Sequence, residues 1–121
     1  MGVLDKIPLE AGEAAIDTWT LLYVPPNGGK YNGKLKVTNQ RLLYDAKFDM
    51  SAAGMLSEAL FVKFGSEGVV IIPKLRIMKV DVQKSLFAKK VLVTLDDGHV
   101  HTFNYGMLNI DPVVTAIQQR S

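Results

Sequence analysis

Hydrophobic and polar residues alternate along most of the chain, and this alternation is typical of strands that bury one face. Pro, Gly, Asn and Asp separate the alternating runs and mark the turns between them. The pattern predicts seven strands, at residues 16–24, 34–38, 41–48, 68–72, 76–83, 90–95 and 99–105. The Val-Val-Ile-Ile run from residue 69 is unbroken, which indicates burial on both faces or an apolar neighbour on the outside.

Asn39 and Gln40 predict a two-residue turn between the second and third strands. The turn pairs Lys34 with Asp45, Leu35 with Tyr44, and Val37 with Leu42. This register is self-consistent, because the apolar side chains share one face while Lys34, Lys36 and Arg41 share the other.

The later strands follow the same logic. In the strand at residues 76–83, alternation places Met78, Val80 and Val82 on one face and Lys79, Asp81 and Gln83 on the other. A turn with Gly98 in the left-handed conformation pairs Val91 with Phe103 and Val93 with His101. Both patterns predict antiparallel strands with one buried face.

The chain is predicted to end in an amphipathic helix. Asp111 is expected to be its N-cap and Pro112 its first residue, with Val113, Val114 and Ile117 on the apolar side. Seven strands and one helix favour a mainly β domain in which a barrel of two bent sheets is plugged by the helix, since the sheet edges must be closed or covered.

Residues 49–66, DMSAAGMLSEALFVKFGS, break the alternation between the third and fourth strands and are too apolar for an ordinary loop. Three interpretations stay open: a flap packed on its own barrel, a surface for a protein partner or a second copy, and shallow membrane insertion. The residues that would form an interaction surface are Met55, Leu56, Leu60, Phe61 and Phe64.

Composition restricts the class of protein. The 121 residues predict one domain, 48% of them are hydrophobic, and the net charge of +2 creates no global field for nucleic acid or an anionic bilayer. The chain has no cysteine, which suits a reducing compartment, and no secretory signal or run of roughly 20 apolar residues. We expect a cytoplasmic location, with a peripheral membrane position as the second expectation.

Catalytic motifs are missing from the sequence. It contains no Gly-x-Ser-x-Gly stretch, phosphate loop or dinucleotide fingerprint, and basic and aromatic residues do not interleave as in an RNA-binding face. His99 and His101 share one strand face at a spacing that could hold a metal, but no third ligand is near at helpful spacing. We therefore expect no enzyme, no metal, no cofactor and no nucleic-acid partner.

Four stretches carry a family resemblance. They are LEAGE at residues 9–13, GKLKVTNQRLLY at 33–44, IIPKLRIMKV at 71–80 and VLVTLDDGHVHTF at 91–103. In their order and spacing, over about residues 8–118, the chain resembles the GRAM branch of the pleckstrin-homology-like (PH-like) superfamily, including its small bacterial single-domain members. The resemblance implies a seven-stranded antiparallel barrel capped by the C-terminal helix, no catalysis, and binding of lipid headgroups or proteins.

The same resemblance draws attention to the basic hairpin. Phosphoinositide-binding members clamp phosphates with a lysine late in strand one and a basic-x-Arg pair in strand two. Lys34 and Lys36 resemble the pair, with Lys30 in the preceding loop and Arg41 on the same hairpin. Strand one carries no basic residue, Lys36 lacks the fork of arginine, and Asp45 would offset Lys34. This set is either a headgroup site or a solvated strand face.

From these observations we predict a non-enzymatic interaction module. The leading hypothesis is binding of protein, a partner or a second copy, through the apolar segment at residues 49–66, with an exposed sheet edge as a second surface. The alternative is peripheral binding to anionic lipid headgroups through Lys30, Lys34, Lys36 and Arg41.

Overall fold

The computed structural model describes residues 3–26, 28–45, 61–64 and 67–119. Its strands are β1 (Ala15–Val24), β2 (Tyr31–Thr38), β3 (Arg41–Asp45), β4 (Phe61–Phe64), β5 (Glu67–Pro73), β6 (Ile77–Lys84), β7 (Lys89–Leu95) and β8 (Val100–Asn104). Its helices are the 3-10 turns η1 (Val3–Lys6) and η2 (Lys74–Arg76) and the C-terminal helix α2 (Asp111–Gln118). The fold is mainly β, as predicted.

All strands lie in one antiparallel sheet, in the order β4-β5-β3-β2-β1-β8-β7-β6. Each of the seven predicted strands is present within a few residues of its expected bounds. The short strand β4 is an addition, because Phe61–Phe64 lies in the segment assigned to an insertion and instead pairs with β5. The rest of the predicted insertion, residues 49–60 and 65–66, lies outside the described residues.

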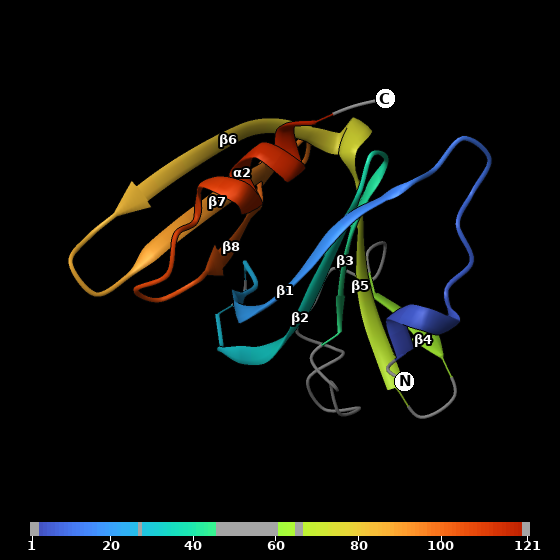
Figure 1. Cartoon of the computed structure of the whole chain (residues 1–121), viewed down its shortest axis with the longest axis horizontal. Coiled ribbons are helices and arrows are strands. Elements are labelled where there is room, and N and C mark those ends of the chain that lie inside the picture. Colours follow the sequence, from blue (N-terminus) through green and yellow to red (C-terminus); the bar gives the residue numbers. More distant parts are fainter. Residues whose placement is uncertain (1–2, 27, 46–60, 65–66, 120–121) are drawn as a thin grey trace.

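The expected barrel of two bent sheets is wrong in one respect, because the sheet is open. Among the described residues, β4 and β6 are its outer strands and have a neighbour on one side only. The sheet bends sharply where β1 meets β8, a ladder of only three pairs at Leu22, Tyr23 and Val24 (Figure 1). The helix α2, and not a closing ladder, covers the open side, since α2 contacts β1, β2 and β6.

The main core lies inside the bend. It contains aromatic side chains from three strands, Tyr23, Tyr44 and Phe103, whose ring centroids lie 4.9 to 6.0 Å apart. The apolar side of α2 completes this core with Val113, Ala116 and Ile117. The predicted amphipathic helix is therefore confirmed, and its apolar side determines where it packs.

A second, smaller core lies on the outer face of the sheet. Leu4 and Ile7, from η1 and the residue after it, pack on Leu43 and Val69. Because Val70 and Ile72 face the main core, β5 is buried on both faces. This confirms the burial predicted from the Val-Val-Ile-Ile run.

The predicted registers of both hairpins are confirmed. Lys34 lies opposite Asp45 in the first hairpin, and Val91 lies opposite Phe103 in the second. The faces of β6 differ from the prediction, because a bulge between Ile77 and Lys79 shifts the alternation. Ile77 packs with Val80 against the core and leaves Met78 exposed.

The start of α2 also differs slightly. The helix begins at Asp111, and Ile110 is its N-cap without a side-chain hydrogen bond. Asn109 Oδ1 accepts the backbone N–H of Asp111, while the Asp111 carboxylate accepts a hydrogen bond from Lys84 Nζ. Asp111 therefore does not cap the helix, because its side chain binds β6. Within the part of the chain that the structure describes, no helix has the length and hydropathy to cross a membrane.

Candidate functional site

Arg41, one of the four predicted anion-site residues, forms a buried ion pair. Its Nε donates to Glu13 Oε2 at 2.8 Å and its Nη2 donates to Glu13 Oε1 at 2.7 Å, so the contact is bidentate. Thr38 Oγ1 also donates to Glu13 Oε2, at 2.6 Å. The hydrogen bonds from Arg41 are the main reason why the pKa of Glu13 is lowered to about 2, against the opposing effect of burial.

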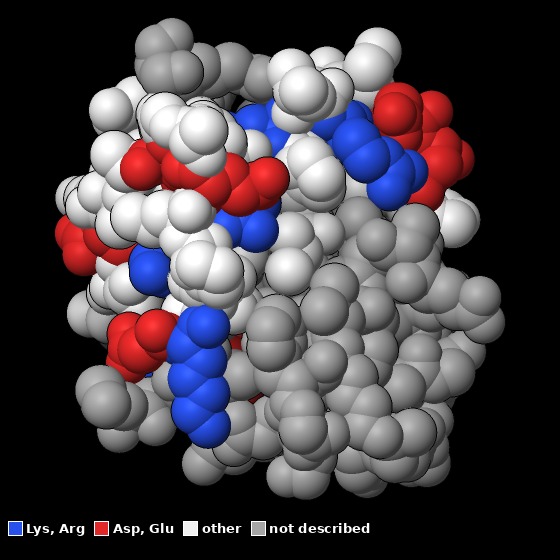
Figure 2. Space-filling model, turned by 90° about the vertical axis from the view of Figure 1, so that its right-hand side faces the viewer, with Lys and Arg blue, Asp and Glu red and all other residues white. Residues whose placement is uncertain are grey.

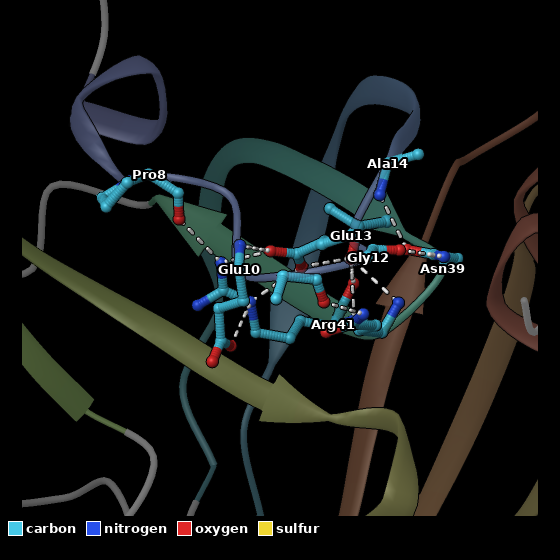
Figure 3. Close-up of polar contacts among 10 residues, drawn as sticks. Pro8, Glu10, Gly12, Glu13, Ala14, Asn39 and Arg41 are labelled. Atoms are coloured by element: carbon cyan, nitrogen blue, oxygen red, sulfur yellow. Dashed lines mark hydrogen bonds and ion pairs between the residues drawn. The ribbon is translucent and has the colours of Figure 1, made fainter.

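The two turn residues bind the same N-terminal segment (Figure 3). Asn39 Oδ1 accepts the N–H of Ala14 at 2.8 Å, and Asn39 Nδ2 donates to the carbonyl of Gly12 at 3.0 Å. Gln40 Nε2 donates to the carbonyl of Ala11 at 3.0 Å. The Thr-Asn-Gln-Arg stretch therefore clasps residues 8–14 onto the β2–β3 turn, and we call this group of contacts the N-terminal clasp.

Lys34 and Lys36 lie at a different place from Arg41. They line a hollow of about 400 Å³ together with Leu4, Asp5, Thr18 and Asp45. Two carboxylates thus face two ammonium groups, and the local charge is balanced. Lys30 is exposed in the β1–β2 loop and does not line this hollow. The structure consequently does not bring the four predicted residues together.

The charges on the face that carries the N-terminal segment are mixed. Among the residues that the structure describes on this face, Lys and Arg are interspersed with Asp and Glu and do not merge into one basic patch (Figure 2). Such a surface gives a weak, short-range field at physiological ionic strength.

The predicted apolar interaction surface is only partly described. Met55, Leu56 and Leu60 lie outside the described residues. Phe61 and Phe64 belong to β4, where their Cα atoms are opposite those of Val70 and Glu67. Their role in binding stays a prediction.

Lys74 is a buried charge that no sequence pattern predicts. Its Nζ donates to the carbonyl of Ala116 at 2.7 Å and to that of Gln119, at the end of α2. These carbonyls have no partner within the helix and carry the negative end of its dipole. Lys74 therefore fastens the helix to the turn between β5 and β6.

His101 lies opposite Val93 as predicted, but its burial and its contact with Tyr23 were not predicted. Its Nδ1 lies 2.6 Å from the Tyr23 hydroxyl, and the two rings are parallel with centroids 5.9 Å apart. Its Nε2 has no hydrogen-bond partner among the described residues. Burial lowers the pKa of His101 to about 4, so its imidazole is neutral at pH 7. His99 is exposed on the β7–β8 turn, and no group of three metal-binding side chains occurs in the described ranges.

Exposed apolar side chains gather on the half of the molecule that contains β6. Of the eight large hydrophobic residues that are exposed in the described part of the chain, seven lie there, namely Leu75, Met78, Val82, Leu86, Phe87, Met107 and Leu108. Leu75 lies in η2, Met78 and Val82 lie in β6, and the other four lie on two loops at the far end of β6. These are the described surfaces with the clearest capacity to bind a partner.

Comparisons with known proteins show the fold and no function. No family model matches the chain, and no curated protein matches it. Among solved structures, the chain is similar to the C-terminal domain of an unknown protein from Leishmania infantum, known from a crystal structure. The two are 17% identical with a TM-score of 0.51, and the match covers 80% of this chain and 74% of that one. A likeness at this identity concerns architecture alone.

Proposed function

We propose that the protein is a non-enzymatic binding module of the PH-like, GRAM type, and that it binds protein at the outer edge of β6. The strand order supports the PH-like assignment, because β1-β2-β3 and β8-β7-β6 form two meanders that meet where β1 pairs with β8, and a C-terminal helix covers the bend. The partner is an extended segment of another chain or of a second copy, added to the sheet as a further strand.

The observation that carries this proposal is the open edge of β6. Among the described residues β6 pairs only with β7, so half of its backbone hydrogen-bonding groups face outward. Met78 and Val82 are exposed beside that edge and offer apolar contacts to an added strand. The bulge at residues 77–79 interrupts regular pairing there, which leaves Lys79–Lys84 as the segment for a partner.

The buried ionisable groups support a non-enzymatic role. Glu13 is bound by Arg41, Lys74 by carbonyls of α2, and His101 by Tyr23. Each of these groups holds two distant parts of the chain together. A catalytic acid, base or nucleophile needs instead to reach a substrate in a cleft.

The predicted lipid site on the basic hairpin receives less support. Arg41 is held by Glu13, and the hollow beside Lys34 and Lys36 also contains Asp5 and Asp45. A phosphate at this hollow would meet two carboxylates as well as two ammonium groups. The hollow therefore offers an anionic headgroup little net attraction.

The edge of β6 can be tested with peptides and with the protein itself. Peptides selected for binding to the protein should shift the backbone amide resonances of residues 79–84. The double substitution Met78→Glu with Val82→Glu should weaken the binding of these peptides about tenfold or more. Self-association should appear as a mass that rises with concentration in light scattering and falls in the same variant. The control Leu9→Glu adds a charge at an exposed leucine of the N-terminal segment and should change neither result. Binding that leaves the β6 resonances unmoved would contradict the proposal.

A further inference from the structure

Two loops lie side by side at one end of the molecule, directly beyond the C-terminal end of β6 (Figure 1). They are the β6–β7 turn at residues 85–88 and the β8–α2 loop at residues 105–110 (Figure 1). The backbone of Lys89 joins them, because its N–H donates to the carbonyl of Gly106 at 2.8 Å and its carbonyl accepts the N–H of Tyr105 at 2.9 Å. Lys89 Nζ also donates to the carbonyl of Met107, at 3.3 Å.

The β6–β7 turn has a hydrogen-bonded backbone. The Ser85 N–H donates to the carbonyl of Ala88 at 2.8 Å, and Ser85 Oγ accepts the N–H of Ala88 at 3.1 Å. Leu86 and Phe87 are the two central residues of this turn, so the backbone directs them outward. In the other loop, Gly106 has a φ of 64°, a conformation that favours glycine and shapes the chain before Met107 and Leu108.

Together the loops present a compact apolar surface. Its members are four side chains with large exposed fractions, Leu86 at 75%, Phe87 at 71%, Met107 at 67% and Leu108 at 59%. We call these four residues the apolar tip. Single exposed leucines are common on proteins, but four large apolar side chains on two neighbouring loops form a patch that favours a binding role.

The charges around the apolar tip are mainly positive. Lys84, Lys89 and Lys90 flank the β6–β7 turn. The carboxylate of Asp111, at the start of α2, lies close by and is paired with Lys84 Nζ at 2.7 Å. Asp96 and Asp97 lie at the opposite end of the hairpin, where they bind Arg76. The tip therefore combines apolar side chains with an excess of positive charge, unlike the balanced hollow at Lys34 and Lys36.

We propose that the apolar tip inserts into the interfacial region of an anionic lipid bilayer. Leu86, Phe87, Met107 and Leu108 enter the boundary between headgroups and acyl chains, while Lys89 and Lys90 contact the headgroup phosphates. The shape of the tip favours a bilayer over a protein, because a stable protein interface buries about 800 Å² on each partner and needs a broader face than two loop ends. This contact is independent of strand addition at β6.

Vesicle sedimentation tests the proposal with the full chain. Vesicles of phosphatidylcholine with phosphatidylserine should bind the protein, and vesicles of phosphatidylcholine alone should bind it at least tenfold less. Leu86→Ser with Phe87→Ser should reduce binding about tenfold or more, because it removes half of the inserted apolar surface. Loss of one positive charge should reduce vesicle binding roughly fivefold. Lys90→Glu should reduce it by more than that, because the substitution also adds a negative charge.

Two control variants make the test specific. Leu75→Ser changes the most exposed leucine of the described residues, outside the tip, and Lys34→Glu changes a lysine on the basic hairpin. Neither should alter vesicle binding. Equal loss in Lys34→Glu and Lys90→Glu would overturn the proposal, as it would show general attraction or a hairpin site.

The lack of cysteine permits a direct measure of insertion. An environment-sensitive dye attached to Phe87→Cys should shift to shorter wavelength with phosphatidylserine vesicles, while the same dye on Leu75→Cys should not shift. No association at low salt would overturn the proposal. A concentration-dependent mass that Phe87→Ser lowers, without vesicle binding, would show that the tip contacts protein instead.

Discussion

Arg41 offers Glu13 the same forked hydrogen-bonding geometry that it would offer a phosphate. Its position on a basic hairpin predicted an anion site, whereas its actual partner comes from residues before β1. The sequence alone does not single out this partner, because Glu10 and Glu13 both precede the first strand. Only the contact, which spans 28 residues, shows that the acid and the arginine belong together.

The Glu13–Arg41 ion pair should be important for stability. Glu13→Gln leaves the largely buried Arg41 guanidinium without its buried countercharge and should lower the free energy of unfolding by about 3 kcal/mol. The measurement is urea unfolding at neutral pH. Glu10→Gln is the matched control, because Glu10 is exposed, meets Arg41 at 3.4 Å and should contribute less than about 1 kcal/mol. Equal effects of the two substitutions would contradict a special role for the buried pair.

His101 should make the fold sensitive to mild acid. Its pKa is about 4 in the folded chain, below the ordinary value of 6.5, so the unfolded chain binds the proton first as pH falls. Above about pH 6.5, His101 is neutral in both the folded and the unfolded chain, and its contribution to the free energy of unfolding has its full value. About 2 to 3 kcal/mol of it should be lost by pH 4.5, at about 1.4 kcal/mol per pH unit. Urea unfolding at several pH values measures this loss.

The variants His101→Phe and His99→Gln identify the group responsible. His101 lies against Tyr23 on β1, and Asp97, His99 and Arg76 act on it through their charges. His101→Phe keeps a ring in that place and should flatten the pH dependence between 6.5 and 4.5, while exposed His99→Gln should leave it intact. Glu13 titrates in another window, because its pKa of about 2 means that its stabilisation is lost only as pH falls from about 4.5. An unchanged slope in His101→Phe would refute the assignment.

Individual elements were predictable where a local pattern determines them. Alternation and a two-residue turn were sufficient to obtain the register of the β2–β3 hairpin. The bulge at Met78 was not predictable, because side-chain period alone does not reveal an extra residue in a strand. Strand β4 was missed for a different reason. A four-residue strand within an apolar segment shows too little periodicity to be recognised.

Lys74 should stabilise α2 in particular. Lys74→Met keeps a long side chain but leaves the carbonyls of Ala116 and Gln119 without this donor, and it should lower the free energy of unfolding by about 1 to 3 kcal/mol. Thermal unfolding followed by circular dichroism measures the change. Lys79→Met is the matched control, because Lys79 is exposed on the outer strand β6 and its surface ion pair contributes little. A loss in both variants would point to a general effect of charge.

At the scale of the molecule, the sequence predicted a mainly β fold with a helix across the sheet, and the structure has both. It did not predict that the sheet stays open, since closure depends on which distant strands meet. The β1–β8 contact and the Tyr23–His101 pair join residues about 80 positions apart, and the latter spans 78. The candidate site was less predictable than the fold. The exposure of Leu86 and Phe87 can be predicted only when the position of the β6–β7 hairpin relative to the rest of the molecule is known.

The position of η1 has a practical consequence for imaging the protein. This turn packs beside β3 and β5, whereas the apolar tip lies at the opposite end of the molecule, on the β6–β7 turn (Figure 1). A fluorescent protein fused through a flexible linker ahead of η1 would therefore be held away from the tip. Such a fusion can report recruitment to vesicles or cell membranes without obstructing the surface whose binding it records.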